Sequence, residues 1–180
     1  MAAAPYPYFW VRKMRSFFVL FDRDLDGLVN KKDYVDWIAG RVSQLIPKEK
    51  AEAYIPLCSA AWDFYWADKA VNDNVNIIDM IQIHSRYLSD PNFHESAEEY
   101  FAAFFDSVDA NSDGMISLPE YVAFLECYGV HPLSVTPSFE ALDTNHDGMI
   151  SKEEFVKAGT DYFQVTADTP AKLFWGPFRG

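Results

Sequence analysis

Three segments of twelve residues share one spacing of oxygen-bearing side chains, and this spacing constrains the fold more than any other feature. The segments cover 22–33, 109–120 and 143–154. In each, Asp or Asn stands at positions 1, 3 and 5, glycine at position 6, an apolar residue at position 8 and a carboxylate at position 12. Glycine permits the positive φ angle that a sharp turn needs. The pattern therefore predicts three tight loops whose oxygens face a common centre.

The oxygens of these loops suit a hard divalent cation. Calcium takes about six to eight oxygen ligands, and a loop of this spacing supplies them from alternate positions, with a backbone carbonyl at position 7. The spacing matches the calcium loop of EF-hand proteins. An Asp- and Gly-rich surface turn explains one such loop, but not three that each lie between helical patterns. The predicted ligands are Asp22, Asp24, Asp26, Leu28, Asn30 and Asp33, then Asp109, Asn111, Asp113, Met115, Ser117 and Glu120, and finally Asp143, Asn145, Asp147, Met149, Ser151 and Glu154.

A fourth segment, 68–79, aligns with these loops but lacks two of their features. Position 3 is Ala70, which has no side-chain oxygen, and position 6 is Asp73 instead of glycine. Val75 keeps the apolar position and Asp79 the final carboxylate. Because EF-hands pair through their loops, we interpret this segment as a structural hand that pairs with the first loop and has lost tight ion binding. A weak ion site is the alternative.

Apolar residues at helical spacing on both sides of each loop predict an all-α fold. We expect four EF-hands in two paired lobes that form one compact globule, with short β-bridges between the paired loops. The N-terminal pair covers 1–90, with hand 1 active and hand 2 degenerate, and the C-terminal pair covers 91–164, with hands 3 and 4 active. Residues 165–180 form an aromatic C-terminal tail that we expect to pack between the lobes. Pro56 predicts a helix that is kinked or begins late.

Composition and charge exclude several classes of function. The net charge is −12, most of it from ten carboxylates at the predicted ligand positions, and no basic cluster indicates a nucleic acid or an anionic membrane as partner. No apolar run approaches a membrane span, and the first residues match neither a signal peptide nor a myristoylation motif. Cys58 and Cys127 lie far apart, and we expect reduced thiols. These features predict a cytoplasmic monomer with no obligate protein partner.

The chain resembles the invertebrate sarcoplasmic calcium-binding proteins, particularly the annelid type. The resemblance covers the whole length and rests on active hands one, three and four, on the aspartate that closes the first loop (Asp33) and on the tail at 172–177, which contains Phe-Trp-Gly-Pro. It implies a protein of the sarcoplasm or of neurons that binds both calcium and magnesium in a compact arrangement of lobes.

The residues themselves favour a calcium buffer. Asp33 is one methylene shorter than the glutamate usual at position 12, so we expect six-fold coordination and magnesium competition in the 22–33 loop. Glu120 and Glu154 should prefer calcium more strongly. A sensor needs an adaptable groove rich in methionine, whereas this chain has 5 Met beside 15 Phe, 10 Tyr and 5 Trp. We therefore predict a buffer with three calcium sites and no enzymatic activity.

Two other functions remain open. Coelenterate photoproteins share this order of active and silent hands, so a coelenterazine-type luciferin-binding protein or photoprotein on the same scaffold is one alternative. Photoproteins typically place a histidine where this chain has Met14, and their last exiting helix carries a histidine that 155–163 lacks. The second alternative is a calcium sensor with a protein target. The four histidines are scattered, at His84, His94, His131 and His146.

Overall fold

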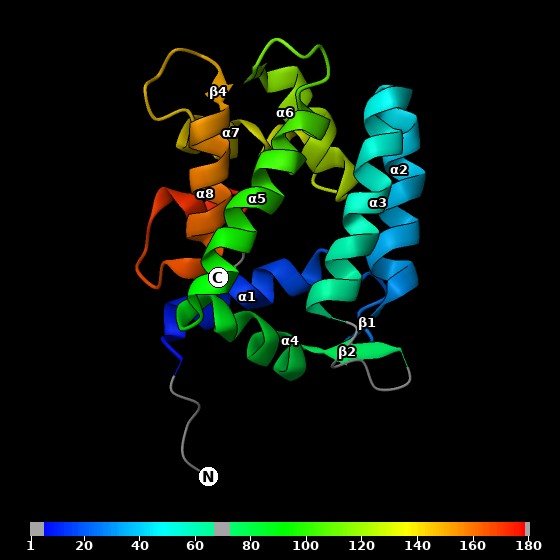
Figure 1. The fold of residues 1–180 in the computed structure, drawn as a ribbon, viewed down its shortest axis with the longest axis vertical. Coiled ribbons are helices and arrows are strands. Elements are labelled where there is room, and N and C mark those ends of the chain that lie inside the picture. Colours follow the sequence, from blue (N-terminus) through cyan, green and yellow to red (C-terminus); the bar gives the residue numbers. More distant parts are fainter. Residues whose placement is uncertain (1–5, 67–72, 179–180) are drawn as a thin grey trace.

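The structure is a computed structural model that describes residues 6–66 and 73–178. Helices dominate these residues and confirm the all-α fold (Figure 1). The helices are α1 (Tyr8–Val19), α2 (Trp37–Leu45), α3 (Lys48–Tyr65), α4 (Ile77–His84), α5 (Pro91–Val108), α6 (Leu118–Cys127), α7 (Thr136–Leu142) and α8 (Lys152–Gln164). Shorter helical turns are η1 (Lys32–Asp36), η3 (Ser85–Leu88), η4 (Pro132–Ser134) and η5 (Pro170–Leu173). Within the described residues, no helix combines the length and apolar character needed to cross a bilayer.

Two short antiparallel bridges join the loops in pairs, as predicted. Strand β1 (Leu28–Asn30) pairs with β2 (Asn74–Asn76), and β3 (Met115–Ile116) pairs with β4 (Ile150–Ser151). The apolar residues at position 8 face each other in both bridges and are fully buried, because each loop covers the open edge of its partner. In Figure 1 the β1–β2 bridge and the end of the molecule that holds β4 lie far apart. The facing pairs are Val29 with Val75 and Ile116 with Ile150.

The second loop makes its turn without glycine. Asp73 at position 6 has a φ angle of +65°, close to the +82° of Gly27 at the same position of the first loop. Aspartate tolerates this left-handed region better than most residues do, so its presence does not prevent the turn. Asn76 then caps α4 by accepting hydrogen bonds from two backbone N–H groups. The first part of this loop, including Asp68, Ala70 and Asn72, lies outside the described residues.

Pro56 does not delay the start of its helix. Helix α3 begins at Lys48, and Pro56 lies within it on an exposed face. Proline removes the hydrogen bond to the carbonyl four residues earlier, which is that of Glu52. Glu52 is also exposed, so water can satisfy this carbonyl and the helix continues. Of the two expectations, the late start was therefore wrong, and the kink stays a prediction.

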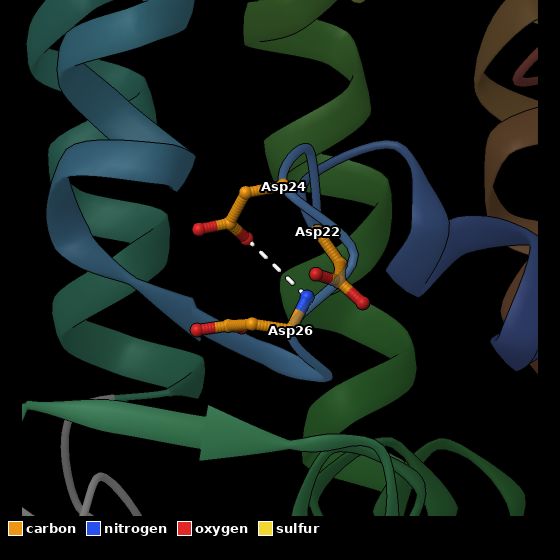
Figure 2. A group of neighbouring side chains, drawn as sticks. All are labelled: Asp22, Asp24 and Asp26. Carbon is orange, nitrogen blue, oxygen red and sulfur yellow. Dashed lines mark hydrogen bonds between the residues drawn. The ribbon is translucent and has the colours of Figure 1, made fainter.

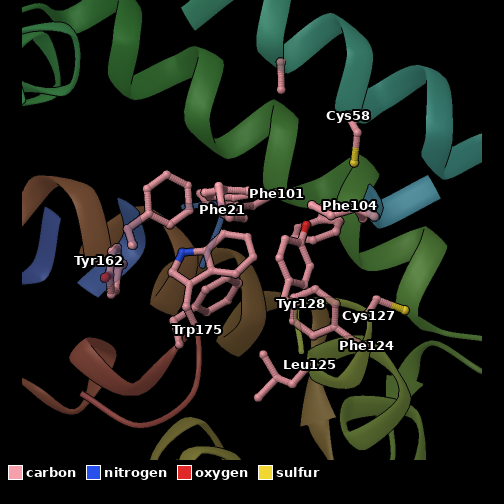
Figure 3. Packing of buried hydrophobic residues seen from close by; sticks show 14 of the residues in the cluster. Phe21, Cys58, Phe101, Phe104, Phe124, Leu125, Cys127, Tyr128, Tyr162 and Trp175 are labelled. Atoms are coloured by element: carbon pink, nitrogen blue, oxygen red, sulfur yellow. The ribbon is translucent and has the colours of Figure 1, made fainter. Parts of the chain in front are cut away.

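Aromatic side chains from both halves of the chain meet in one continuous core (Figure 3). The C-terminal tail is part of it: Phe174 is fully buried and Trp175 is 6% exposed. The ring of Trp175 lies 5.3 Å from that of Phe17 in α1 and 5.0 Å from that of Tyr128 after α6. The hydroxyl of Tyr121 donates a hydrogen bond to the carbonyl of Phe174 at 2.8 Å. The tail thus packs against residues from both the first and the third hands.

Several titratable groups are buried in this core, and burial favours their neutral forms. His84 stacks on Phe163 at 5.3 Å, and its Nδ1 lies 2.9 Å from the carbonyl of Met80. Burial lowers the pKa of His84 to about 4, so the ring is neutral at pH 7. Cys58 and Cys127 are free and buried, and burial raises the pKa of each thiol to about 12.

Candidate metal centres

The aspartate at position 1 of each predicted loop is buried and has no cationic partner in the described part of the chain. Asp22, Asp109 and Asp143 are 7%, 5% and 6% exposed. Each accepts a hydrogen bond from the backbone N–H of the glycine at position 6 of its own loop, at 3.2, 2.9 and 2.9 Å. No ion pair of the described residues includes any of the three. A buried carboxylate without a positive partner is costly, so these oxygens fit a bound cation.

In the first loop, three carboxylates lie close together (Figure 2). One ligand oxygen from each of Asp22, Asp24 and Asp26 lies within 4.8 Å of the others. The backbone N–H of Asp26 donates to Asp24 Oδ1 at 3.4 Å, and that of Leu28 donates to Asp26 Oδ1 at 2.8 Å. These bonds fix the turn, but they leave three like charges unbalanced. A divalent cation among them would relieve the repulsion.

The third and fourth loops share one pattern of hydrogen bonds. Asp113 and Asp147, at position 5, each accept from the backbone N–H at position 7 at 2.9 Å. The amides of Asn111 and Asn145, at position 3, donate to these same aspartates at 2.8 and 2.9 Å. All of these side chains are exposed at the loop surface. The two loops are therefore formed alike, with oxygen-only ligand sets suited to a hard cation.

The residue at position 12 separates the first loop from the other two. Glu120 reaches back across its loop, where Oε1 accepts from the backbone N–H at position 2 at 3.0 Å while Oε2 accepts from that of Ser117 at 2.7 Å. Glu154 makes the same two bonds, at 2.9 Å each. Asp33 accepts from the backbone of Asn30 at 3.0 Å, and no hydrogen bond among the described residues joins it to position 2. The shorter side chain does not span the loop.

The residue at position 12 also lies in a different type of helix in the first loop than in the other two. Glu120 and Glu154 lie in the first turns of α-helices, in capping boxes with Ser117 and Ser151. Asp33 instead lies in η1, a π-helical turn, which is a rare geometry that often occurs at functional sites. Sequence reasoning found the shorter side chain but not this wider turn.

The carboxylate of Glu154 is held in its ionised form. Burial alone would raise its pKa, but hydrogen bonds from Ser151 and Thr144 outweigh burial and lower the pKa to about 2. The group is therefore charged throughout the physiological pH range, as a cation ligand must be.

Each predicted ligand residue lies in its expected loop. The position 7 residues Leu28 and Met115 begin strands β1 and β3, while Met149 directly precedes β4. Two of the position 9 side chains accept hydrogen bonds from the backbone at the start of the exiting helices. Asn30 Oδ1 accepts from the backbone of Asp33 at 3.2 Å, and Ser151 Oγ accepts from that of Glu154 at 3.2 Å.

Two arginines of the first hand bind the C-terminal end of α6, which the sequence did not indicate. Arg23, at position 2 of the first loop, donates to the carbonyl of Tyr128 at 2.5 Å. Arg41 of α2 donates to the carbonyl of Glu126 at 2.8 Å. The guanidinium of Arg23 also lies 3.3 Å from the ring centre of Trp37. Carbonyls at a helix C-terminus lack intrahelical partners and favour cations, so the first hand stabilises the exit helix of the third.

Lys13 of α1 caps the C-terminal end of α8 in the same way. Its ammonium group is fully buried and donates to the carbonyl of Val165 at 2.5 Å. Burial lowers the pKa of Lys13 to about 8, although the charges of Asp161 and Asp168 oppose this shift. Trp10 Nε1 donates to the carbonyl of Phe163 at 2.6 Å. Carbonyl groups at the C-terminal ends of both exit helices, α6 and α8, thus accept hydrogen bonds from side chains of the first hand.

Comparison with known proteins agrees with this geometry. A family model described as EF hand matches residues 101–125 and 136–158. A sarcoplasmic calcium-binding protein of Perinereis vancaurica tetradentata is 39% identical over 170 residues, which cover 93% of this chain and 97% of that protein.

Solved structures share the fold at lower identity. The okadaic acid binding protein 2.1 superimposes with a TM-score of 0.77 at 20% identity, covering 99% of this chain and 100% of the other. A coelenterazine-binding protein from Renilla muelleri, in its calcium-loaded apo form, gives a TM-score of 0.72 at 24% identity, covering 92% and 93%. Because the match to the sarcoplasmic protein extends over nearly the whole of both chains, this chain belongs to the sarcoplasmic calcium-binding proteins, which are calcium-binding proteins of the EF-hand type.

Proposed function

We propose that this protein is a calcium buffer with three ion sites, in the loops 22–33, 109–120 and 143–154. The observation that carries the proposal is the position of the C-terminal tail. Phe174 and Trp175 occupy the core beside the third and fourth hands, where a target helix would have to bind in a sensor. A protein whose own tail fills this position stores cations and does not present a groove to a partner.

The cationic caps support the same function. A sensor EF-hand opens when its two helices change their angle after calcium binds. Here Arg23, Arg41 and Lys13 donate hydrogen bonds to carbonyl groups at the C-terminal ends of the exit helices α6 and α8. Opening of these hands would therefore break several charge-assisted hydrogen bonds. We infer that the C-terminal pair remains closed when it binds calcium.

The first site differs from the others in its expected selectivity. Magnesium needs near-octahedral geometry with short bonds, whereas calcium accepts a bidentate carboxylate and a larger coordination number. The short reach of Asp33 favours a single oxygen at position 12. We propose that magnesium competes mainly at 22–33, and that Glu120 and Glu154 make the other two sites calcium sites. Buffer proteins of this kind have dissociation constants of about 10⁻⁹–10⁻⁸ M.

The second hand then serves a structural purpose. Its strand β2 pairs with β1 and buries Val75 against Val29. We propose the division predicted from the sequence: an N-terminal pair over 1–90, a C-terminal pair over 91–164 and a tail over 165–180 that joins them. The name of the Perinereis relative supports a location in the sarcoplasm, and we propose a monomer there, which light scattering after size-exclusion chromatography would test.

Calorimetric titration of the protein with calcium, with and without millimolar magnesium, tests this function. We expect three ions per chain and weaker apparent calcium binding in magnesium. Single variants Asp22→Ala, Asp109→Ala and Asp143→Ala should each lower the stoichiometry by one, whereas Glu52→Gln on an exposed face of α3 should not. Four ions per chain would show that the second hand binds, and an isotherm unchanged by magnesium would contradict the mixed-site buffer.

A luciferin-binding protein or photoprotein is the main alternative, because a coelenterazine-binding protein shares the fold. An organic ligand needs a cavity of about 300–1,000 Å³. The cavity in the aromatic core, beside His84 and Trp175, has a volume of about 20 Å³, which is near the size of one water. This packing favours the buffer. A chromophore retained after mixing with coelenterazine, or light on adding calcium, would support the alternative.

A calcium sensor is the second alternative, and it predicts that calcium exposes apolar surface. Fluorescence of a hydrophobic dye should therefore rise when calcium replaces magnesium if the protein is a sensor. We expect no rise, because the tail remains in the core in both states.

A further inference from the structure

A half-open pocket lies beside the first loop, at the edge of the aromatic core. It has a volume of about 310 Å³ and is formed by α1, the first loop, the connection between α6 and α7, and the C-terminal tail. The wall includes Leu20, Val130 and Trp175. This volume falls within the range of small-molecule sites, unlike that of the core cavity.

Two of the residues that line the pocket are exposed apolar side chains. Leu25 and Val19 line it and are 75% and 39% exposed, which is unusual for large apolar side chains in this protein. Leu133, 86% exposed, stands in the chain between His131 and Ser134, which are both lining residues. Exposed apolar residues that line a pocket, here Val19 and Leu25, indicate a ligand with an apolar body.

The charged residues of the pocket favour an anion. Arg23 and Lys172 line it, and Asp22 is the acidic residue among the lining side chains. Lys172 forms an ion pair with Asp168 at 2.7 Å, but no carboxylate of the described residues lies within 4.0 Å of the Arg23 guanidinium. Arg23 donates to the carbonyl of Tyr128, which leaves further N–H donors in its planar group.

Trp175, which lines the same pocket, has a donor without a partner among the described residues. Its indole Nε1 is buried and has no hydrogen-bond partner among the described residues. Such a group normally binds protein or water. Trp175 lines both this pocket and the core cavity beside His84.

We propose that this pocket binds a small organic anion, in which a carboxylate or sulfonate binds Arg23 and an aromatic or aliphatic body lies against Val130 and Trp175. The ligand would bridge the first loop and the tail, two segments that calcium storage alone does not require to meet at a pocket. This inference goes beyond the buffer function and is independent of the number of ion sites.

Calorimetric titration of the full-length protein at saturating calcium tests the proposal with naphthalene-2-sulfonate as the probe. The neutral naphthalene-2-sulfonamide has the same body without the charge. We expect one sulfonate per chain, with the sulfonamide and the Arg23→Gln variant each weaker by about tenfold, which corresponds to the loss of one charge-assisted hydrogen bond. Lys48→Gln, at a distant exposed lysine of α3, should bind as the wild type does.

A second variant keeps the test decisive if Arg23→Gln unfolds. Ser134→Phe adds bulk at the lining of the pocket in the α6–α7 connection and should abolish binding while leaving the circular dichroism spectrum unchanged. The proposal is wrong if the sulfonate does not saturate a single site, if the sulfonamide binds equally well, or if Ser134→Phe binds as the wild type does. Calcium stoichiometry measured on the same samples separates this failure from failure of the buffer function.

Discussion

Replacing Trp175 by alanine should remove much of the stability that the tail provides. The side chain is 6% exposed, and its ring centre lies 5.0–5.9 Å from those of Phe17, Phe104, Phe124 and Tyr128. Truncation of a buried Trp leaves a cavity among these rings as well as losing the transfer free energy of the indole. We expect the free energy of unfolding to fall by about 3–5 kcal/mol.

Urea unfolding at saturating calcium, followed by far-ultraviolet circular dichroism, measures this loss. With an m value of about 2 kcal/mol/M, the midpoint should fall by about 2 M. Leu133→Ala is the matched control, because that side chain is 86% exposed and its loss should cost less than about 0.5 kcal/mol. A loss below about 1 kcal/mol for Trp175→Ala would refute the conclusion that the tail is part of the core. Calcium affinity should be measured for both variants, since bound ions also stabilise the folded state.

Three further predictions follow from single residues. Asp33→Glu should let the carboxylate span the first loop and should reduce magnesium competition in calcium titrations. Glu120→Asp should introduce such competition in the third loop. Equal effects of magnesium on the wild type and both variants would contradict this. The pKa of His84 in the folded protein, about 4, lies below its unfolded value of 6.5. As the pH is lowered, the unfolded chain therefore gains a proton first. The free energy of unfolding should fall by up to about 3 kcal/mol between pH 6.5 and 4. Urea unfolding should show this slope in the wild type and a smaller one in His84→Phe, whereas equal slopes would assign it to other groups. Gly129→Ala should lower the free energy of unfolding by about 1–2 kcal/mol in the same assay. The φ angle at this position is +73°, and the new methyl group would meet the Arg23 guanidinium. An unchanged free energy of unfolding would disprove that contact.

The sequence predicted the turns and the pairing of the loops because their chemistry is local. Twelve contiguous residues contain the turn glycine, the oxygen ligands and the apolar residue of the bridge, so no distant contact is needed to recognise them. The pairing of Val29 with Val75 followed from the same reasoning, because an open loop edge requires a partner. The short side chain of Asp33 also predicted, from the sequence alone, that the first loop differs from the other two at position 12.

Other features depended on contacts between distant residues. In the sequence, Arg23 stands at a variable position of the loop, yet its hydrogen-bond partner Tyr128 lies 105 positions away. Lys13 appears as a surface lysine of an amphipathic helix, but it is buried against Val165, 152 positions away. Neither the periodicity of a helix nor the spacing of a loop contains such information.

The sequence by itself determined that this protein has EF-hand loops, how they pair and which of the four segments has no side-chain oxygen at position 3. The tertiary structure decided that the first hand caps the exit helices of the third and fourth, that Trp175 lies in the core and that a pocket remains beside Arg23. The physical reason is the range of the interactions. Ion ligands are placed by the local backbone, whereas helix capping, aromatic packing and cavities arise only when segments far apart in the chain are brought together.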